Sequence, residues 1–173
     1  MDLCIDNMLI QKNEEKLQLV GSRAIKNRIK REIEDLYKIY KDVEVNLKDG
    51  ELIVSISEVI NNKKHKYSFL ITMNYPFEPP KIFYQNKTYL DYLKINYTRK
   101  EFILLKKVSG HDCFCCHSYN CRGNWSPAVT LKKIIEEIYE IKKIKKNMIN
   151  KICADIIKKK YLIEDIDLDS WLF

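Results

Sequence analysis

Residues Val43–Met73, VEVNLKDGELIVSISEVINNKKHKYSFLITM, decide the fold, because their apolar residues recur at every second position. A period of two places apolar side chains on one face of a strand and polar side chains on the other. The dipeptide Asp49-Gly50 accepts the positive φ angles of a tight hairpin turn, and the polar break Asn61–Lys64 precedes a third strand. The stretch therefore predicts an antiparallel meander. Its inward-facing residues are Val43, Val45, Leu47, Leu52, Val54, Ile56, Tyr67, Phe69, Ile71 and Met73.

A helix is predicted before the meander, beginning at Ser22. Its apolar residues recur at steps of three and four, which gives one apolar stripe on an α-helix. The stripe consists of Ile25, Ile29, Ile33, Leu36 and Tyr40. Residues 1–21 show no clear period, and we interpret them as an N-terminal extension.

A proline-rich segment follows the meander at Tyr75–Tyr84, YPFEPPKIFY. Three of the five residues at 76–80 are prolines, which lack the N–H donor that a helix or a central strand requires. The pattern predicts a stiff, bent segment that leads into a fourth strand at Lys81–Tyr84. Residues 85–110 are predicted to be an insertion of short helices, with Gly110 as a C-cap.

The stretch His111–Leu131, HDCFCCHSYNCRGNWSPAVTL, contains four of the six cysteines, and these four lie within a segment of nine residues. Ser126 has the side chain of a helix N-cap, and Pro127 suits the first helical position. A long amphipathic helix is therefore predicted from this point, continuing or restarting as far as Lys160. Residues 163–173 form an acidic tail that ends in aromatic residues, and we expect it to dock on a partner, to pack on its own domain or to fray.

The 173 residues and 46% apolar content fit one globular domain with an α+β fold. The net charge of +7 comes mainly from scattered lysines without an accompanying aromatic pattern, so they are interpreted as solvated faces and nucleic-acid binding is not expected. No apolar run is long enough to span a membrane, and a cytoplasmic or nuclear location is expected. Cysteines in such a compartment are expected to be reduced, metal-bound or catalytic.

The order of these features resembles a ubiquitin-conjugating enzyme. The most specific matches are Tyr75–Lys81 and Trp125–Thr130, and Arg28–Ile33 is similar to the family's first-helix pattern. The resemblance predicts a domain over residues 22–162, with one helix before a four-stranded antiparallel sheet and helices after it. Phe69, Ile71 and Ile138 are expected in the core. The cysteine cluster further resembles divergent members encoded by large DNA viruses, which would place the protein in a host cell.

By this resemblance, a cysteine shortly before Trp125 accepts ubiquitin, or a ubiquitin-like modifier, as a thioester from the activating enzyme. Cys116 is the predicted nucleophile, with Cys113 and Cys115 as alternatives, while Cys121 lies too close to Trp125. Arg28 and Arg31 are then expected to meet the activating enzyme. The ligase-facing patch is predicted to contain Phe77, Pro127 and Ala128.

The family's His-Pro-Asn motif is absent upstream of the cysteines, and Asn120 and Asn124 are the candidates to replace its asparagine. This absence keeps a second hypothesis open, in which the same fold is an inactive module that binds ubiquitin or a ligase.

Zinc is the rival explanation of the cysteine cluster. Its predicted ligands are Cys113, Cys116 (or Cys115), Cys121 and His111 (or His117). A single compact cluster is unlike the two separated pairs of common structural zinc sites, so no cofactor is expected.

Overall fold

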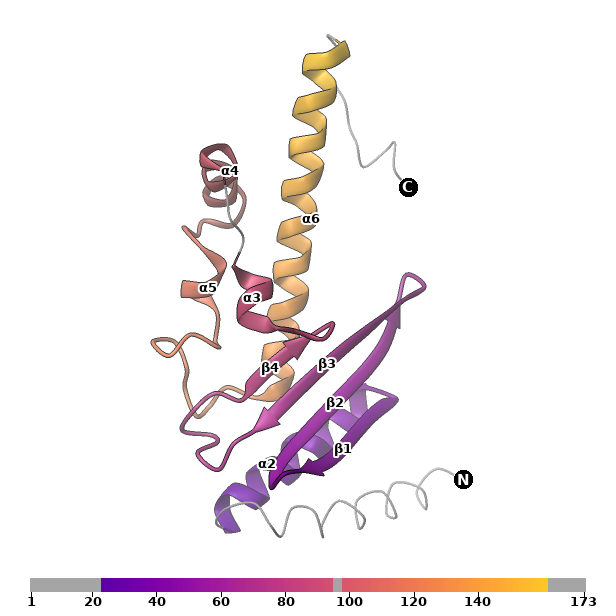
Figure 1. Cartoon of the computed structure of the whole chain (residues 1–173), viewed down its shortest axis with the longest axis vertical. Coiled ribbons are helices and arrows are strands. Elements are labelled where there is room, and N and C mark those ends of the chain that lie inside the picture. The colour runs from indigo at the N-terminus through magenta and orange to yellow at the C-terminus, as the bar shows by residue number, and fades with distance from the viewer. Residues whose placement is uncertain (1–22, 95–97, 162–173) are drawn as a thin grey trace. The chain divides into compact units, whose positions relative to one another are not determined.

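The structure, a computed structural model, describes residues 23–94 and 98–161. The chain has an α+β fold with a five-stranded antiparallel sheet whose strands lie in sequence order (Figure 1). The predicted N-terminal extension and acidic tail lie outside the described residues. The strands are β1 (Asp42–Lys48), β2 (Glu51–Ile60), β3 (Lys63–Ile71), β4 (Lys81–Tyr84) and β5 (Lys87–Thr88).

The helices are α2 (Arg23–Ile39), α3 (Tyr89–Leu93), α4 (Arg99–Ser109), α5 (Phe114–His117) and α6 (Leu131–Tyr161). The described residues divide into two compact units, one of residues 23–94 and 115–136 and one of residues 98–114 and 137–161. The predicted short helices of the 85–110 segment are present as α3 and α4. None of the described helices is long and apolar enough to cross a membrane.

Tight two-residue turns connect the strands and set the register of the meander. Asp49 and Gly50 have φ angles of 53° and 78°, and Asn61 and Asn62 have φ angles of 50° and 59°. Positive φ at both turn residues matches the right-handed twist of the flanking strands. The predicted meander is confirmed, and it pairs Val54 with Val45 on one side and with Phe69 on the other.

The prediction of four strands is wrong by one short strand. Gln85 and Asn86 have φ angles of 51° and 62°, so a third tight turn reverses the chain after β4. β5 then pairs with β4 through Phe83 and Thr88. A two-residue strand has too few residues to show alternation, which is why the sequence pattern did not reveal it.

The core of the first unit lies between α2 and one face of the sheet (Figure 1). Ile29, Ile33 and Leu36 of α2 are buried, as the helical stripe predicts. Phe69 and Ile71 of the first unit are at most 1% exposed, and Ile138 of the second unit is fully buried, so the predicted buried positions are confirmed.

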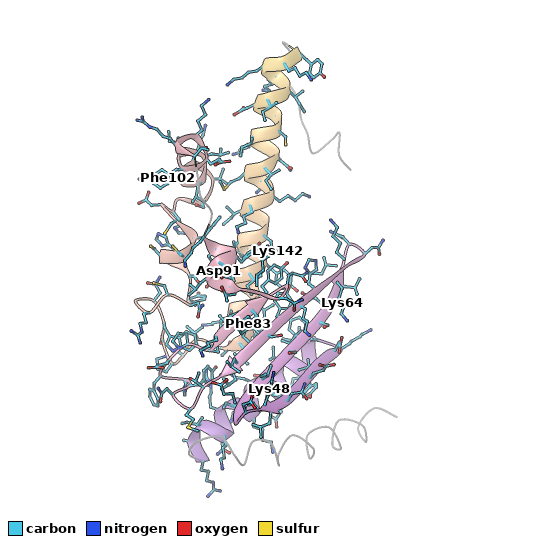
Figure 2. The ribbon with its side chains drawn as sticks, viewed as in Figure 1. Lys48, Lys64, Phe83, Asp91, Phe102 and Lys142 are labelled. Carbon is cyan, nitrogen blue, oxygen red and sulfur yellow. The ribbon has the colours of Figure 1, made fainter. Side chains whose placement is uncertain are left out.

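The outward positions of the sheet carry charged residues such as Lys48 and Lys64 (Figure 2). Met73 does not continue the third strand as predicted. β3 ends at Ile71, and Met73 is 72% exposed in the turn that follows. Here the Tyr75 N–H donates to the Thr72 carbonyl, and this turn bond ends the alternation.

The prediction that the long helix begins at Ser126-Pro127 is also wrong. The Val129 N–H donates to the Ser126 carbonyl at 2.9 Å, which closes an isolated turn. α6 begins at Leu131, and the Thr130 side chain accepts from the Lys133 N–H at 3.2 Å in the manner of an N-cap. A serine-proline pair fits either a turn or a helix start, so local sequence did not separate the two.

Candidate active site

The cysteine-rich loop follows α4 and contains the short helix α5. α4 ends at Gly110, whose φ of 74° provides the predicted left-handed C-cap. Phe114 of α5 is buried, whereas Cys116 is exposed. Cys113, Cys115 and Cys121 are partly exposed. Cys116 is therefore the loop cysteine most open to a large partner.

The thiols of three neighbouring cysteines converge. The sulfur atoms of Cys115 and Cys116 lie 3.9 Å apart, and over the consecutive residues 113–116 the three cysteine sulfurs lie within 4.8 Å of one another. Thiolates gathered in this way suit a soft or borderline metal ion such as Zn²⁺. Cys121 and His111, which complete the predicted zinc set, lie outside this group.

Asn124 holds the backbone of the predicted nucleophile. Its side-chain amide donates to the Cys116 carbonyl oxygen, and it lies 3.4 Å from the Ser118 carbonyl oxygen. The backbone N–H of Asn120 donates instead to the hydroxyl of Ser118, a residue that is 1% exposed. Of the two predicted asparagines, Asn124 is the one that positions the loop around Cys116.

The indole of Trp125 joins the loop to the proline-rich segment. Its Nε1–H donates to the Pro76 carbonyl oxygen at 2.8 Å. The rings of Trp125 and Tyr75 pack with centroids 6.1 Å apart and a 48° tilt. Two segments about fifty residues apart in the sequence are therefore in direct contact. This contact fixes the C-terminal end of the cysteine loop.

A buried carboxylate, Glu32 of α2, is bonded to Tyr75 of this contact and is 5% exposed. Its Oε1 accepts from the Tyr75 hydroxyl at 2.6 Å and from the Arg28 guanidinium, and its Oε2 accepts from the Leu131 N–H at 2.7 Å. An anion at the N-terminus of α6 also interacts favourably with the helix dipole. Burial, together with the charge of Glu32, raises the pKa of Tyr75, so the hydroxyl remains a donor.

Glu32 was not among the predicted site residues, although the sequence carries a signal for it. Glu32 follows Ile29 by three residues and precedes Leu36 by four, so it occupies the apolar face of α2. A carboxylate on the buried stripe of an amphipathic helix requires partners. One partner, Arg28, lies four residues earlier on the same helix, whereas Tyr75 and Leu131 come from two distant segments that no local pattern identifies.

The predicted partner-binding residues differ in their solvent exposure and in their contacts within the chain. Phe77 is 73% exposed, and Arg31, Pro127 and Ala128 are also exposed. The bond between Trp125 and Pro76 brings the segments of Phe77 and Pro127 together. Arg28, in contrast, contacts Glu32 and donates to the Val129 carbonyl at 3.3 Å. Arg31 is therefore the better placed of the two arginines to meet a partner.

Lys145 is a second residue of interest that was not among the predicted site residues. It lies on α6 between Ile141 and Met148, both buried on the same helix face. Its Nζ lies 5.6 Å from the centroid of the Phe114 ring. Burial lowers the pKa of Lys145 to about 8, from an ordinary value of 10.5, because the charged form loses water.

This burial predicts a pH-dependent effect of Lys145→Met. The folded protein releases the Lys145 proton at lower pH than the unfolded chain, so the cost of burying the charge is present below about pH 8 and disappears toward pH 10.5. The variant should be more stable than the parent at pH 7, and its advantage should shrink as pH rises through this window. Urea unfolding at pH 7 and pH 10 measures the difference.

Lys143→Met is the matched control, because Lys143 is an exposed lysine of the same helix. Its effect on unfolding should be the same at both pH values. An advantage of Lys145→Met that does not change with pH would contradict the proposed cost of burial.

Comparison of the chain with protein-family models, with curated proteins and with solved structures found no match.

Proposed function

We propose that this chain is a ubiquitin-conjugating enzyme of divergent type, which accepts ubiquitin or a ubiquitin-like modifier on Cys116. The observation that carries the proposal is the contact of Trp125 with Pro76. It joins the two sequence segments on which the resemblance rests, Tyr75–Lys81 and Trp125–Thr130. The exposed thiol of Cys116 lies nine residues before Trp125.

The order of elements supports the same proposal. One amphipathic helix precedes an antiparallel meander, and the proline-rich segment, the cysteine loop and a long helix follow in turn. Glu32 bonds the first helix, the proline-rich segment and the start of α6 to one another. Such a scaffold would hold an open loop against the much larger partners that the reaction requires.

The proposed reaction is a transthiolation followed by transfer. The Cys116 thiolate attacks the carbonyl carbon of the thioester that links the modifier to the activating enzyme. A new thioester forms, and the activating enzyme's cysteine leaves as a thiolate. A lysine amine, or a ligase cysteine, later attacks the new thioester and releases Cys116. Sulfur suits both steps because a thiolate is a good nucleophile and a good leaving group.

A charging assay tests the proposal. The protein is incubated with a ubiquitin-activating enzyme, ATP and ubiquitin, and then resolved with and without reductant. An ATP-dependent adduct that disappears under reductant is expected. Absence of an adduct with ubiquitin, and with ubiquitin-like modifiers presented by their own activating enzymes, would contradict an active conjugating enzyme.

The convergent thiols favour a second candidate, an inactive module of the same fold that holds a metal ion. Cys113, Cys115 and Cys116 together offer three sulfur ligands. A zinc ion bound there would occupy the predicted nucleophile and stabilise the loop. One zinc per purified chain, with no charging, would support this candidate, which would then bind ubiquitin or a ligase without catalysis.

The exposed aromatic ring of Phe77 provides a test of the proposed ligase surface. Phe77→Ala should weaken binding to a cooperating ligase several-fold, because an exposed aromatic anchor carries a large share of an interface. Its 73% exposure predicts little effect on folding. Charging by the activating enzyme should be unchanged, and a ligase pull-down beside a charging assay measures both.

Val59→Ala is the matched control, since Val59 is 70% exposed on β2. It should leave both ligase binding and charging intact. Loss of charging in Phe77→Ala would show that this residue does not belong to a surface for the ligase alone.

A further inference from the structure

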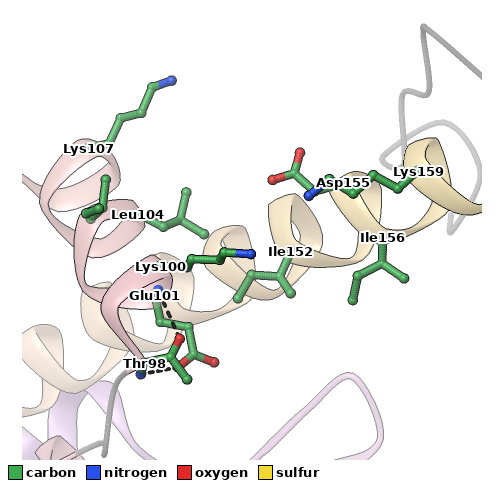
Figure 3. A pocket seen from close by; sticks show the side chains of 10 residues that line it. Thr98, Lys100, Glu101, Leu104, Lys107, Ile152, Asp155, Ile156 and Lys159 are labelled. Atoms are coloured by element: carbon green, nitrogen blue, oxygen red, sulfur yellow. Dashed lines mark hydrogen bonds between the residues drawn. The ribbon is translucent and has the colours of Figure 1, made fainter.

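An open groove of about 420 Å³ lies between α4 and the C-terminal part of α6. Lys100 and Leu104 project from α4 toward Ile152 of α6 (Figure 3). The volume falls within the range of roughly 300–1,000 Å³ that is common for ligand sites. All residues that line the groove belong to the second unit.

The groove exposes apolar side chains on both helices. Ile103 of α4 and Ile156 of α6 line it, and each is 59% exposed. Phe102, next to Ile103 on α4, is 42% exposed (Figure 2). Apolar side chains gathered on a surface gain free energy when another segment covers them. The groove therefore suits an apolar segment.

The charged residues of the groove favour an acidic occupant. Lys100, Lys107 and Lys159 line it together with Glu101 and Asp155. The carboxylate of Glu101 already accepts from the Thr98 N–H at 2.7 Å in a capping box. The last turn of α6 adds two further lysines beside Lys159. Lysines thus outnumber carboxylates around an apolar floor.

A segment of this chain has the complementary chemistry. Residues 163–173, IEDIDLDSWLF, combine four carboxylates with isoleucine, leucine, tryptophan and phenylalanine. We propose that this segment docks in the groove between α4 and α6 of its own chain. Its carboxylates meet the lysines, and its apolar residues, including Trp171, cover Ile103 and Ile156.

The length of the connection allows this arrangement. The segment begins two residues after Tyr161, where α6 ends. The ten residues from Tyr161 to Trp171 span up to about 33 Å when extended. The helix between Ile152 and Tyr161 is only about 14 Å long. The segment can therefore return to the groove, and its attachment gives it a millimolar effective concentration.

Fluorescence of Trp171 in the full chain tests the proposal. The emission of Trp171 is the difference between the parent and Trp171→Phe, which retains Trp125. We expect acrylamide to quench Trp171 several-fold less in the parent than free N-acetyltryptophanamide. The double change Lys100→Glu with Lys107→Glu should raise its quenching toward the free value, because the variant groove repels the carboxylates.

Two comparisons make the test specific. Arg99→Glu with Lys151→Glu reverses exposed charges on the same helices outside the groove lining and should leave Trp171 protected. The double change Ile103→Ser with Ile156→Ser removes apolar side chains of the groove. It should increase the acrylamide quenching of Trp171, while circular dichroism shows an intact fold. The proposal would be overturned if Trp171 of the parent were quenched as strongly as free N-acetyltryptophanamide. It would also be overturned if Trp171 were protected and neither groove variant changed that protection. Protection that is lost on dilution would assign the groove to the tail of a second copy instead.

Discussion

Replacing Cys116 with serine should abolish the reducible ubiquitin adduct and leave an adduct that resists reductant. Serine at the accepting position can still attack the thioester, but the product is an oxyester. Oxygen is the poorer leaving group, so this ester survives thiol treatment and passes the modifier on slowly. The exposure of Cys116 predicts that the exchange changes the chemistry without disturbing the fold. Gel electrophoresis with and without reductant distinguishes the two adducts.

The other cysteines of the chain provide the comparisons. Cys113→Ser and Cys115→Ser test the alternative nucleophiles of the same loop. Cys153→Ser is the matched control, because Cys153 is exposed on α6, away from the loop in the sequence. If Cys116→Ser still forms the reducible thioester at the normal rate, Cys113 becomes the candidate. Normal charging by the variants of Cys113, Cys115 and Cys116 would mean that none of these three cysteines alone is the nucleophile.

The sheet of this protein could be predicted because its signals are local. Alternation over Val43–Ile71 gave the strands and their faces, and Asp49-Gly50 gave the first turn. Turn chemistry and side-chain alternation act over a few residues, so neither depends on the rest of the fold.

The two errors of prediction have different physical causes. Ser126-Pro127 has the local preference of a helix start, yet α6 begins at Leu131, whose N–H is bonded to Glu32 ninety-nine residues away. β5 exists because a turn at Gln85-Asn86 brings two residues back onto β4. A tertiary contact thus decides where α6 begins, whereas β5 is too short for side-chain alternation to reveal it.

The candidate site was predictable in part. Cysteines crowded before Trp125 identified the loop, and the structure adds that Cys116 is exposed and that Asn124 holds its carbonyl. The role of Asn124 depends on the path of the loop between the two residues, which spacing alone does not give. The burial of Lys145 against Phe114 likewise depends on contacts between distant segments.

Glu32→Ala should destabilise the protein by about 3 kcal/mol, the low end of the range for breaking a buried ion pair, because Arg28 keeps partial access to water. The change leaves the Tyr75 hydroxyl and the Leu131 N–H without their shared acceptor. For a chain of this size the loss corresponds to a melting temperature lower by about 6–12 °C. Urea unfolding monitored by circular dichroism measures it.

The variants should rank by how many hydrogen bonds of the Glu32 network they remove, where the network consists of Glu32, Arg28, Tyr75 and Leu131. The loss of stability should be largest for Glu32→Ala. Tyr75→Phe deletes one hydrogen bond to the charged Glu32 and should cost about 1.5 kcal/mol. Asp35→Ala is the matched control on α2, because its ion pair with Lys38 is exposed and should contribute nothing measurable. If Glu32→Ala proved no more costly than Asp35→Ala, the carboxylate would not hold α2, the proline-rich segment and the start of α6 together.

If the network does position the cysteine loop, Tyr75→Phe should also slow charging at temperatures where the variant remains folded, because Tyr75 packs against Trp125.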